Sequence, residues 1–185
     1  MALKATIFKA ELQIADMDRN YYRDHALTLA RHPSETDERL MMRLLAYALH
    51  AGDGLAFGRG LSTEDEPDLW RKDLTGAVKL WIDVGQPDDK RVRKACGRAD
   101  AVVVYSYGGR STGVWWDQVG KDLERSRNLT VFSVPSDASR ALAALAQRSM
   151  RLDCTIQDRQ IWLADDQRRV QVDLSLIRAP ATIAR

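Results

Sequence analysis

The chain has 185 residues, and 45% of them are hydrophobic, which is enough apolar side chain for the core of one ordinary domain. Charged residues make up 29%, but the formal net charge of +2 argues against a generally basic, histone-like nucleic-acid binder. No apolar run approaches the roughly 20 residues of a membrane span, and the amino terminus lacks a signal-peptide pattern. We therefore expect a single cytoplasmic domain over residues 1–185, without membrane association.

Two segments near the amino terminus alternate between apolar and polar residues, as strands do. Residues 5–15 form the first segment and residues 21–29 the second, with a turn at residues 17–20 between them. We expect two neighbouring strands.

A helical pattern follows. Ser34, with Asp37 three positions later, resembles a capping box, so the helix is expected to begin at Ser34. Its apolar stripe consists of Leu40, Met41, Leu44, Leu45 and Ala48. Arg39, Arg43 and His50 are expected on the opposite, polar side.

Residues 55–107 contain the strongest strand signals of the chain. Residues 55–61 read as a short strand, and residues 65–70 as an acidic loop that enters a helical turn, with Pro67 in its first turn. Residues 78–84 alternate cleanly, and residues 101–107 form the near-continuous apolar run of a parallel strand buried on both faces. The short basic helix between these two strands implies a right-handed crossover.

The second half continues in the same way. Trp115 marks another helix, residues 129–134 a strand and residues 138–146 an alanine-rich helix. Alternation around residues 152–156 and 161–172 indicates antiparallel strands. The predicted fold is a single-domain α/β protein with a mixed β-sheet flanked by helices.

Four acids are candidates for chemistry. Asp83 ends an otherwise apolar strand, where burying a charge costs several kcal/mol unless it is paired or binds a metal. Ligands of open α/β sheets bind at this end of the strands. Glu66 and Asp68 belong either to a solvated acidic loop or, with Asp83, to a two-acid metal site. Glu38 either interacts with the helix dipole or points inward as a site acid.

Basic residues follow at once along the chain. They are Lys90, Arg91, Arg93, Lys94 and Arg98 on one helix, joined by Arg110 and Lys121 further on. They form either a solvated face or a track for a phosphate backbone. Trp115 and Trp116 are read as core packing or, alternatively, as a base-stacking platform.

Several long segments carry a resemblance to a known family. In order, they are MALKATIFKAELQIADMDRNYY, LTLARHPSETDERLMMRLLAYAL, EDEPDLW, LWIDVGQPDDKRVRKAC and TIQDRQIWLADD. They resemble the bacterial YaeQ family over nearly the whole chain. This resemblance implies a variant of the PD-(D/E)XK nuclease fold, whose core of helix, strands, helix and strand agrees with the predicted order.

The resemblance also assigns roles to residues. Glu38 matches the acid of the first helix, Pro67-Asp68 matches the proline and aspartate, with Glu66 as a neighbouring candidate, and Asp83 matches the acid of the (D/E)xK element. The lysine of that element is missing, because Gly85 stands in its place. Some superfamily members carry this cation on the following helix, where Arg91 or Lys94 would serve.

The implied activity is hydrolysis of nucleic-acid phosphodiesters with Mg²⁺ or Mn²⁺. Asp83 and either Glu66 or Asp68 would hold the metal, Glu38 would act through water or orient the nucleophile, and Arg91 or Lys94 would stabilise developing charge. Three of these carboxylates are expected within one coordination shell. The alternative is an inactive nuclease-fold module that binds DNA, RNA or a protein partner.

Overall fold

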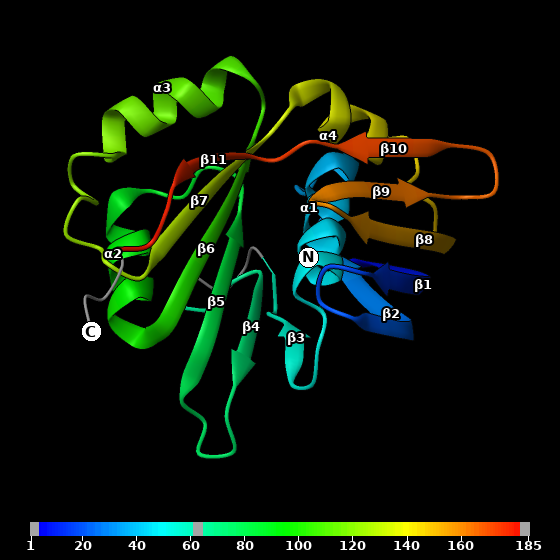
Figure 1. The fold of residues 1–185 in the computed structure, drawn as a ribbon, viewed down its shortest axis with the longest axis horizontal. Coiled ribbons are helices and arrows are strands. Elements are labelled where there is room, and N and C mark those ends of the chain that lie inside the picture. The colour runs from blue at the N-terminus through cyan, green and yellow to red at the C-terminus, as the bar shows by residue number, and fades with distance from the viewer. Residues whose placement is uncertain (1–3, 61–64, 182–185) are drawn as a thin grey trace.

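The computed structural model describes residues 4–60 and 65–181, and its strands form two mixed sheets (Figure 1). One sheet has the order β10-β9-β8-β1-β2 and consists of Arg169–Val172, Gln160–Ala164, Ser149–Gln157, Thr6–Asp16 and Tyr21–Arg31. The other has the order β11-β7-β6-β5-β4-β3 and consists of Ser175–Arg178, Leu129–Val134, Ala99–Tyr107, Val78–Val84, Leu69–Lys72 and Leu55–Phe57.

The mixed character of the sheets was predicted, but the expectation of one sheet was wrong. β8, from the second half of the chain, pairs in parallel with β1, and strands from residues 6–31 and 149–172 thereby build a sheet of their own. Such pairing depends on contacts between residues about 140 positions apart, which local alternation does not reveal. The fold remains a single-domain α/β arrangement.

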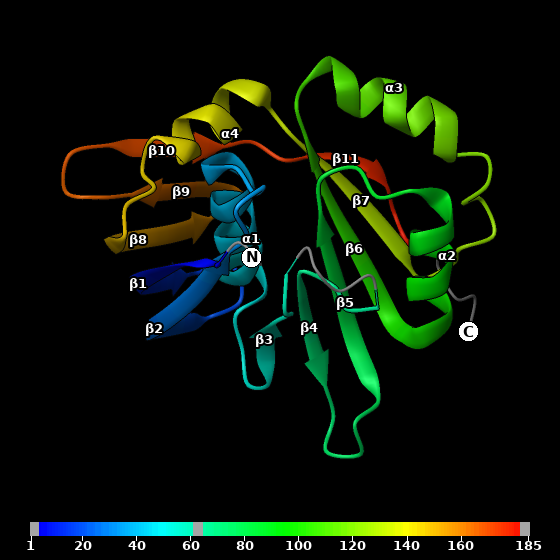
Figure 2. The same ribbon diagram turned by 180° about the vertical axis from the view of Figure 1, so that it is seen from behind.

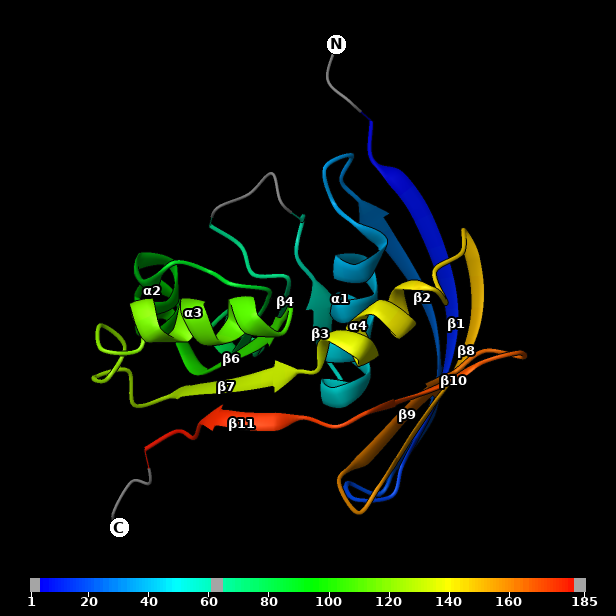
Figure 3. The ribbon, with the colours of Figure 1, turned by 90° about the horizontal axis from the view of Figure 1, so that it is seen from above.

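Helix α1 (Asp37–His50) lies between the two sheets, beside α4 (Ser136–Ala143) (Figure 3). All nine residues from position 40 to position 48 are buried, so the helix has no solvent-facing side over this stretch. The predicted apolar stripe is correct, but the prediction that Arg43 lies on an exposed polar side was wrong. A second sheet covers that side of the helix.

The start of α1 also differs from the prediction. Thr36 is the N-cap, and its hydroxyl accepts a hydrogen bond from Arg39 N at 3.1 Å. Ser34 instead hydrogen-bonds to the His32 ring, and the carboxylate of Asp37 forms an ion pair with Arg31. Ser34, Thr36 and Asp37 are all of residue types that cap helices, and in the folded chain Thr36 takes this position.

The central β5–α2–β6 unit was predicted correctly. β5 and β6 are parallel, and α2 (Asp89–Arg98) connects them. Together with α3 (Arg110–Val119), α2 covers the face of this sheet that points away from α1 (Figure 2). Within the described residues, no helix is long and apolar enough to cross a membrane.

The acidic segment before β5 was predicted incorrectly as a helical turn. It leads into strand β4, which pairs antiparallel with β5. Gly58 packs so closely against it that a Cβ there would lie 1.9 Å from the carbonyl oxygen of Pro67. Pro67 therefore lies two residues before strand β4 instead of in the first turn of a helix, and proline is also tolerated at the beginning of a strand.

The carboxyl end of α1 is closed by side chains from other elements. Arg19 donates to the carbonyl oxygens of Ala51 and Ala48 at 3.0 and 3.3 Å, and Arg71 donates to that of His50 at 2.7 Å. The ring of His50 lies 2.7 Å from the hydroxyl of Tyr105. Burial, reinforced by the charges of Arg19 and Arg71, lowers the pKa of His50 to about 4.

This lowered pKa predicts a loss of stability in acid. Between pH 6.5 and about 4, the unfolded state binds a proton at His50 that the folded state excludes, so the free energy of unfolding falls as pH falls. We expect this residue to account for at most about 3 kcal/mol of the loss. Urea unfolding of the wild type and His50→Gln at pH 7 and pH 4.5 measures it. If the free energy of unfolding falls equally in both proteins between pH 7 and pH 4.5, the prediction is contradicted.

Candidate functional site

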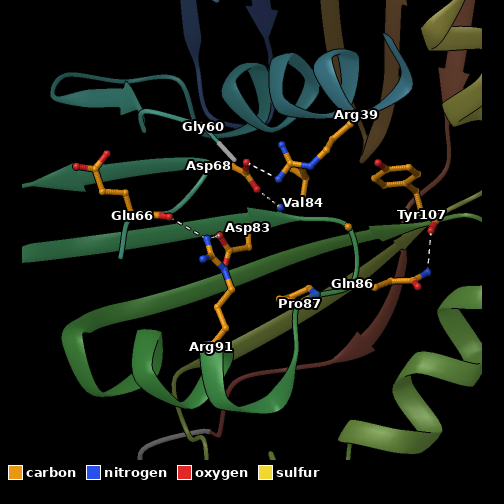
Figure 4. Close-up of a pocket in the computed structure, with 11 residues that line it drawn as sticks. Arg39, Gly60, Glu66, Asp68, Asp83, Val84, Gln86, Pro87, Arg91 and Tyr107 are labelled. Carbon is orange, nitrogen blue, oxygen red and sulfur yellow. Dashed lines mark hydrogen bonds and ion pairs between the residues drawn. The ribbon is translucent and has the colours of Figure 1, made fainter. Parts of the chain in front are cut away.

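A cavity of about 400 Å³ lies at the carboxyl end of β5 (Figure 4). Both faces of the sheet contribute to its lining, because Arg39 comes from α1 and Arg91 from α2. Three carboxylate residues line it with these two arginines: Glu66, Asp68 and Asp83. The pocket thus combines acids and guanidinium groups at the end of the sheet where α/β proteins bind ligands.

Asp68 is buried and lies immediately before strand β4 in the chain. Its Oδ1 accepts a hydrogen bond from Arg39 Nη2 at 2.7 Å, and its Oδ2 accepts one from the backbone N of Val84 at 2.8 Å. Burial raises the pKa of the Asp68 carboxyl above its ordinary value; the Arg39 charge opposes this shift, and the Asp83 charge adds to it. The two aspartates therefore interact electrostatically.

Asp83 is buried at 2% relative exposure and is held by two side chains. Arg91 donates to both of its carboxylate oxygens, from Nε at 3.0 Å and from Nη2 at 2.8 Å, in the bidentate geometry that makes such pairs strong. Trp81 Nε1 donates to Oδ2 at 3.0 Å. Arg91 also donates to the carbonyl oxygen of Glu66 at 2.8 Å, which ties the acidic segment to α2.

Glu35 supports the site from behind, and the sequence reasoning missed it. Arg39 Nη1 donates to Glu35 Oε1 at 3.0 Å, while Arg43 donates to both Glu35 oxygens at 2.8 and 2.9 Å. A chain of ion pairs therefore runs from the core through Glu35 and Arg39 to Asp68. The signal was present in the sequence as an acid and two arginines spaced four residues apart.

The other two candidate acids do not join Asp68 and Asp83. Glu38 accepts a hydrogen bond from Ser139 of α4 at 2.6 Å and does not line the pocket. The Glu66 carboxylate turns to Arg59, whose backbone N donates to it at 3.0 Å. Among the described residues, no three His, Cys, Asp or Glu side chains are grouped to hold a metal ion. Of the expected acids, the structure brings Asp68 and Asp83 together.

The candidate basic residues are dispersed. On α2, Arg93 pairs with Asp89, while Lys94 and Arg98 both reach Asp65. Lys90 is exposed on the same helix. Arg110 begins α3, whereas Lys121 follows its far end and borders a different hollow, near Arg93. Of the two candidate cations, Arg91 enters the pocket, and Lys94 forms its ion pair outside it.

The two aspartates fit a divalent cation in donor type. Mg²⁺ is commonly bound by one or two carboxylates, with water and substrate phosphate completing its shell. From the described residues, Asp68 Oδ1, Asp68 Oδ2 and Asp83 Oδ1 each accept one hydrogen bond, which leaves each oxygen a further lone pair. The positive charge beside them is supplied by Arg39 and Arg91.

The fold and site define a class: a single-domain α/β protein of two mixed sheets with an arginine-paired aspartate pocket. A family described as YaeQ protein matches residues 1–174 of this sequence. The chain is 44% identical over 181 residues to "Uncharacterized protein YaeQ" of Escherichia coli (strain K12) and to the protein of that name from Salmonella typhi, covering 98% of this chain and 100% of each relative. The chain belongs to the YaeQ family.

Solved structures agree with this assignment. The crystal structure of YaeQ protein from Xanthomonas axonopodis pv. citri has a TM-score of 0.91 and 56% identity, over 95% of this chain and 99% of that one. The YaeQ protein from Pseudomonas syringae has a TM-score of 0.90 and 38% identity, over 95% and 97% of the two chains.

The Glu35 network predicts a large effect of a small substitution. Glu35→Gln leaves Arg43, which is 2% exposed, without a carboxylate partner, and should lower the free energy of unfolding by about 3–5 kcal/mol. Glu11→Gln is the matched control, because its pair with Arg151 is exposed on both sides and contributes at most about 1 kcal/mol. Urea unfolding compares the two. Equal small losses would show that the buried pair contributes no more than a surface pair.

Proposed function

We propose that this protein is a variant of the PD-(D/E)XK nuclease fold that hydrolyses nucleic-acid phosphodiesters with Mg²⁺ or Mn²⁺. The observation that carries the proposal is the buried pair of Asp68 and Asp83 facing one pocket. The pairing of Leu69 with Ile82 sets Asp68, just before β4, beside Asp83 of β5. A carboxyl whose pKa is raised by burial and by a neighbouring carboxylate, as that of Asp68 is, and that lies in a pocket is a candidate for a functional site.

The roles follow from the contacts. Asp68 and Asp83 would hold the metal, which when bound would supply a Lewis acid to the scissile phosphate. Arg39 and Arg91 would bind the phosphate oxygens and stabilise the charge that develops there, because a guanidinium matches phosphate geometry. Glu35 acts as a positioning residue, since it fixes Arg39.

A second candidate is a nuclease-fold module that binds nucleic acid or a protein partner without cleaving it. Two observations favour it: Gly85 stands where the family resemblance implies a lysine, and each buried aspartate is already neutralised by an arginine. A module of this kind would use the pocket for recognition alone.

Removing one guanidinium should strengthen metal binding. Arg91→Met takes away a positive charge 2.8 Å from Asp83, so Mn²⁺ should bind at least about tenfold more tightly than to the wild type. Arg93→Met, on the same helix but paired outside the pocket, is the control and should leave the affinity unchanged. Isothermal calorimetry measures both. No Mn²⁺ binding by either the wild type or Arg91→Met, alone or with inorganic phosphate present, would exclude the metal site.

Cleavage separates the two candidate functions. Single- and double-stranded DNA and RNA are incubated with the purified protein, with and without Mn²⁺. The nuclease proposal predicts metal-dependent cleavage that falls at least about 100-fold in Asp83→Asn and is unchanged in Asp89→Asn, whose carboxylate pairs on the surface of α2. Circular dichroism confirms folding of both variants. Salt-sensitive binding without cleavage would instead support the module.

A further inference from the structure

Gly85 has a backbone conformation that disfavours any residue with a side chain. Its φ angle is +98°, a conformation that residues with a Cβ rarely adopt. It directly follows Val84 at the end of β5, beside the two buried aspartates. The backbone conformation of Gly85 therefore keeps a side-chain hydrogen-bond donor away from residue 85. A side-chain donor beside this end of β5 has to come from another strand.

Tyr107 supplies a side chain at that place. It ends β6, which runs parallel to β5, and its ring atom Cε1 lies 4.0 Å from where a Cβ of residue 85 would be. Gln86 fixes the two strand ends together, because its Nε2 donates to the Tyr107 carbonyl oxygen at 3.1 Å and to Ser111 Oγ at 2.7 Å. Figure 4 shows the ring between Arg39 and Gln86.

The hydroxyl of Tyr107 is available as a donor. Among residues 4–60 and 65–181, no group forms a hydrogen bond with Tyr107 Oη, and the residue is half-buried in the pocket lining. Burial raises the pKa of Tyr107 to about 12; the Arg39 charge opposes this, and the carboxylates of Glu38, Asp68 and Glu35 add to it. The phenol therefore keeps its proton at neutral pH.

We propose that Tyr107 is a further catalytic residue, which donates a hydrogen bond from Oη to a non-bridging oxygen of the scissile phosphate. This role rests on the proposed function, because the phosphodiester is its ligand. In the reaction, a water oxygen forms a bond to phosphorus and releases a proton to solvent, while the bridging P–O bond breaks and the leaving oxygen takes up a proton from solvent. Tyr107 keeps its own proton and stabilises the charge that builds on the phosphate oxygens.

A neutral donor suits the charges already present. The guanidinium groups of Arg39 and Arg91 and the carboxylates of Asp68 and Asp83 line the pocket. The two carboxylates oppose phosphate binding, and the two guanidinium groups favour it. A phenol adds a hydrogen bond without adding a third cation beside Arg39 and Arg91. It also adds no cation that would repel a metal ion held by the aspartates.

The test is Tyr107→Phe, which keeps the ring against Gly85 and removes only the hydroxyl. Single-turnover cleavage with Mn²⁺ should slow about 100-fold, and inorganic phosphate should bind about tenfold more weakly in calorimetry with and without Mg²⁺. Tyr22→Phe is the control, because Tyr22 is 59% exposed on the other sheet, and it should change neither value. Thermal unfolding should be similar for all three proteins.

The outcomes distinguish the two proposals. If the wild type cleaves and Tyr107→Phe cleaves equally fast, the role of Tyr107 is overturned and the proposed nuclease function stands. If the wild type does not cleave but binds phosphate, and Tyr107→Phe binds phosphate more weakly, the nuclease function and the catalytic role are overturned. The hydroxyl then remains a phosphate ligand. If the wild type neither cleaves nor binds phosphate, both proposals are overturned.

Discussion

Two aspartates buried beside each other require positive charge close by, and this requirement organises the pocket. Removing a carboxylate from water costs several kcal/mol, and two adjacent ones also repel. One arginine from each face of the same sheet supplies this charge. Arg39 of α1 pairs with Asp68, and Arg91 of α2 pairs with Asp83. The site is therefore assembled only when both helices have packed on the sheet.

The burial of α1 between two sheets extends the same constraint into the core. Residues 40–48 of the helix are buried, so Arg43 has no solvent for its charge and pairs with the carboxylate of Glu35, which Arg39 shares at the edge of the pocket. Arg43 also donates to the carbonyl oxygen of Ala30 in β2, so the network reaches the second sheet. Through this network, packing between the sheets positions Arg39 and hence Asp68.

The parts of the fold that the sequence predicted are those with strong local signals. β5, α2 and β6 follow from an alternating strand, a break at Gly85 to Pro87 and a continuous apolar run, and Asp83 stood out as a charge ending that strand. The two-sheet arrangement depends on pairing of β1 with β8, whose register no local pattern encodes.

The errors at individual residues have the same origin. A helical projection places Arg43 off the apolar stripe, but only the second sheet determines that this side is buried. Glu38 was expected to point into the site, and its partner Ser139 lies 101 residues away on α4. Thr36 and Ser34 are both acceptable caps by sequence, and the ion pair of Asp37 with Arg31 accompanies the start that is observed.

The arginines bear on both candidate functions through charge. The pocket holds the carboxylates of Asp68 and Asp83 beside two guanidinium groups. It weakens the binding of a metal ion alone, because Arg39 and Arg91 repel the ion, and of a phosphate alone, because the carboxylates repel it. A metal and a phosphate entering together would offset both repulsions, the metal against the aspartates and the phosphate against the guanidinium groups. Under the proposed function, the arginine pairs therefore stabilise the two buried aspartates before either ion binds, and they make metal binding stronger when substrate is present.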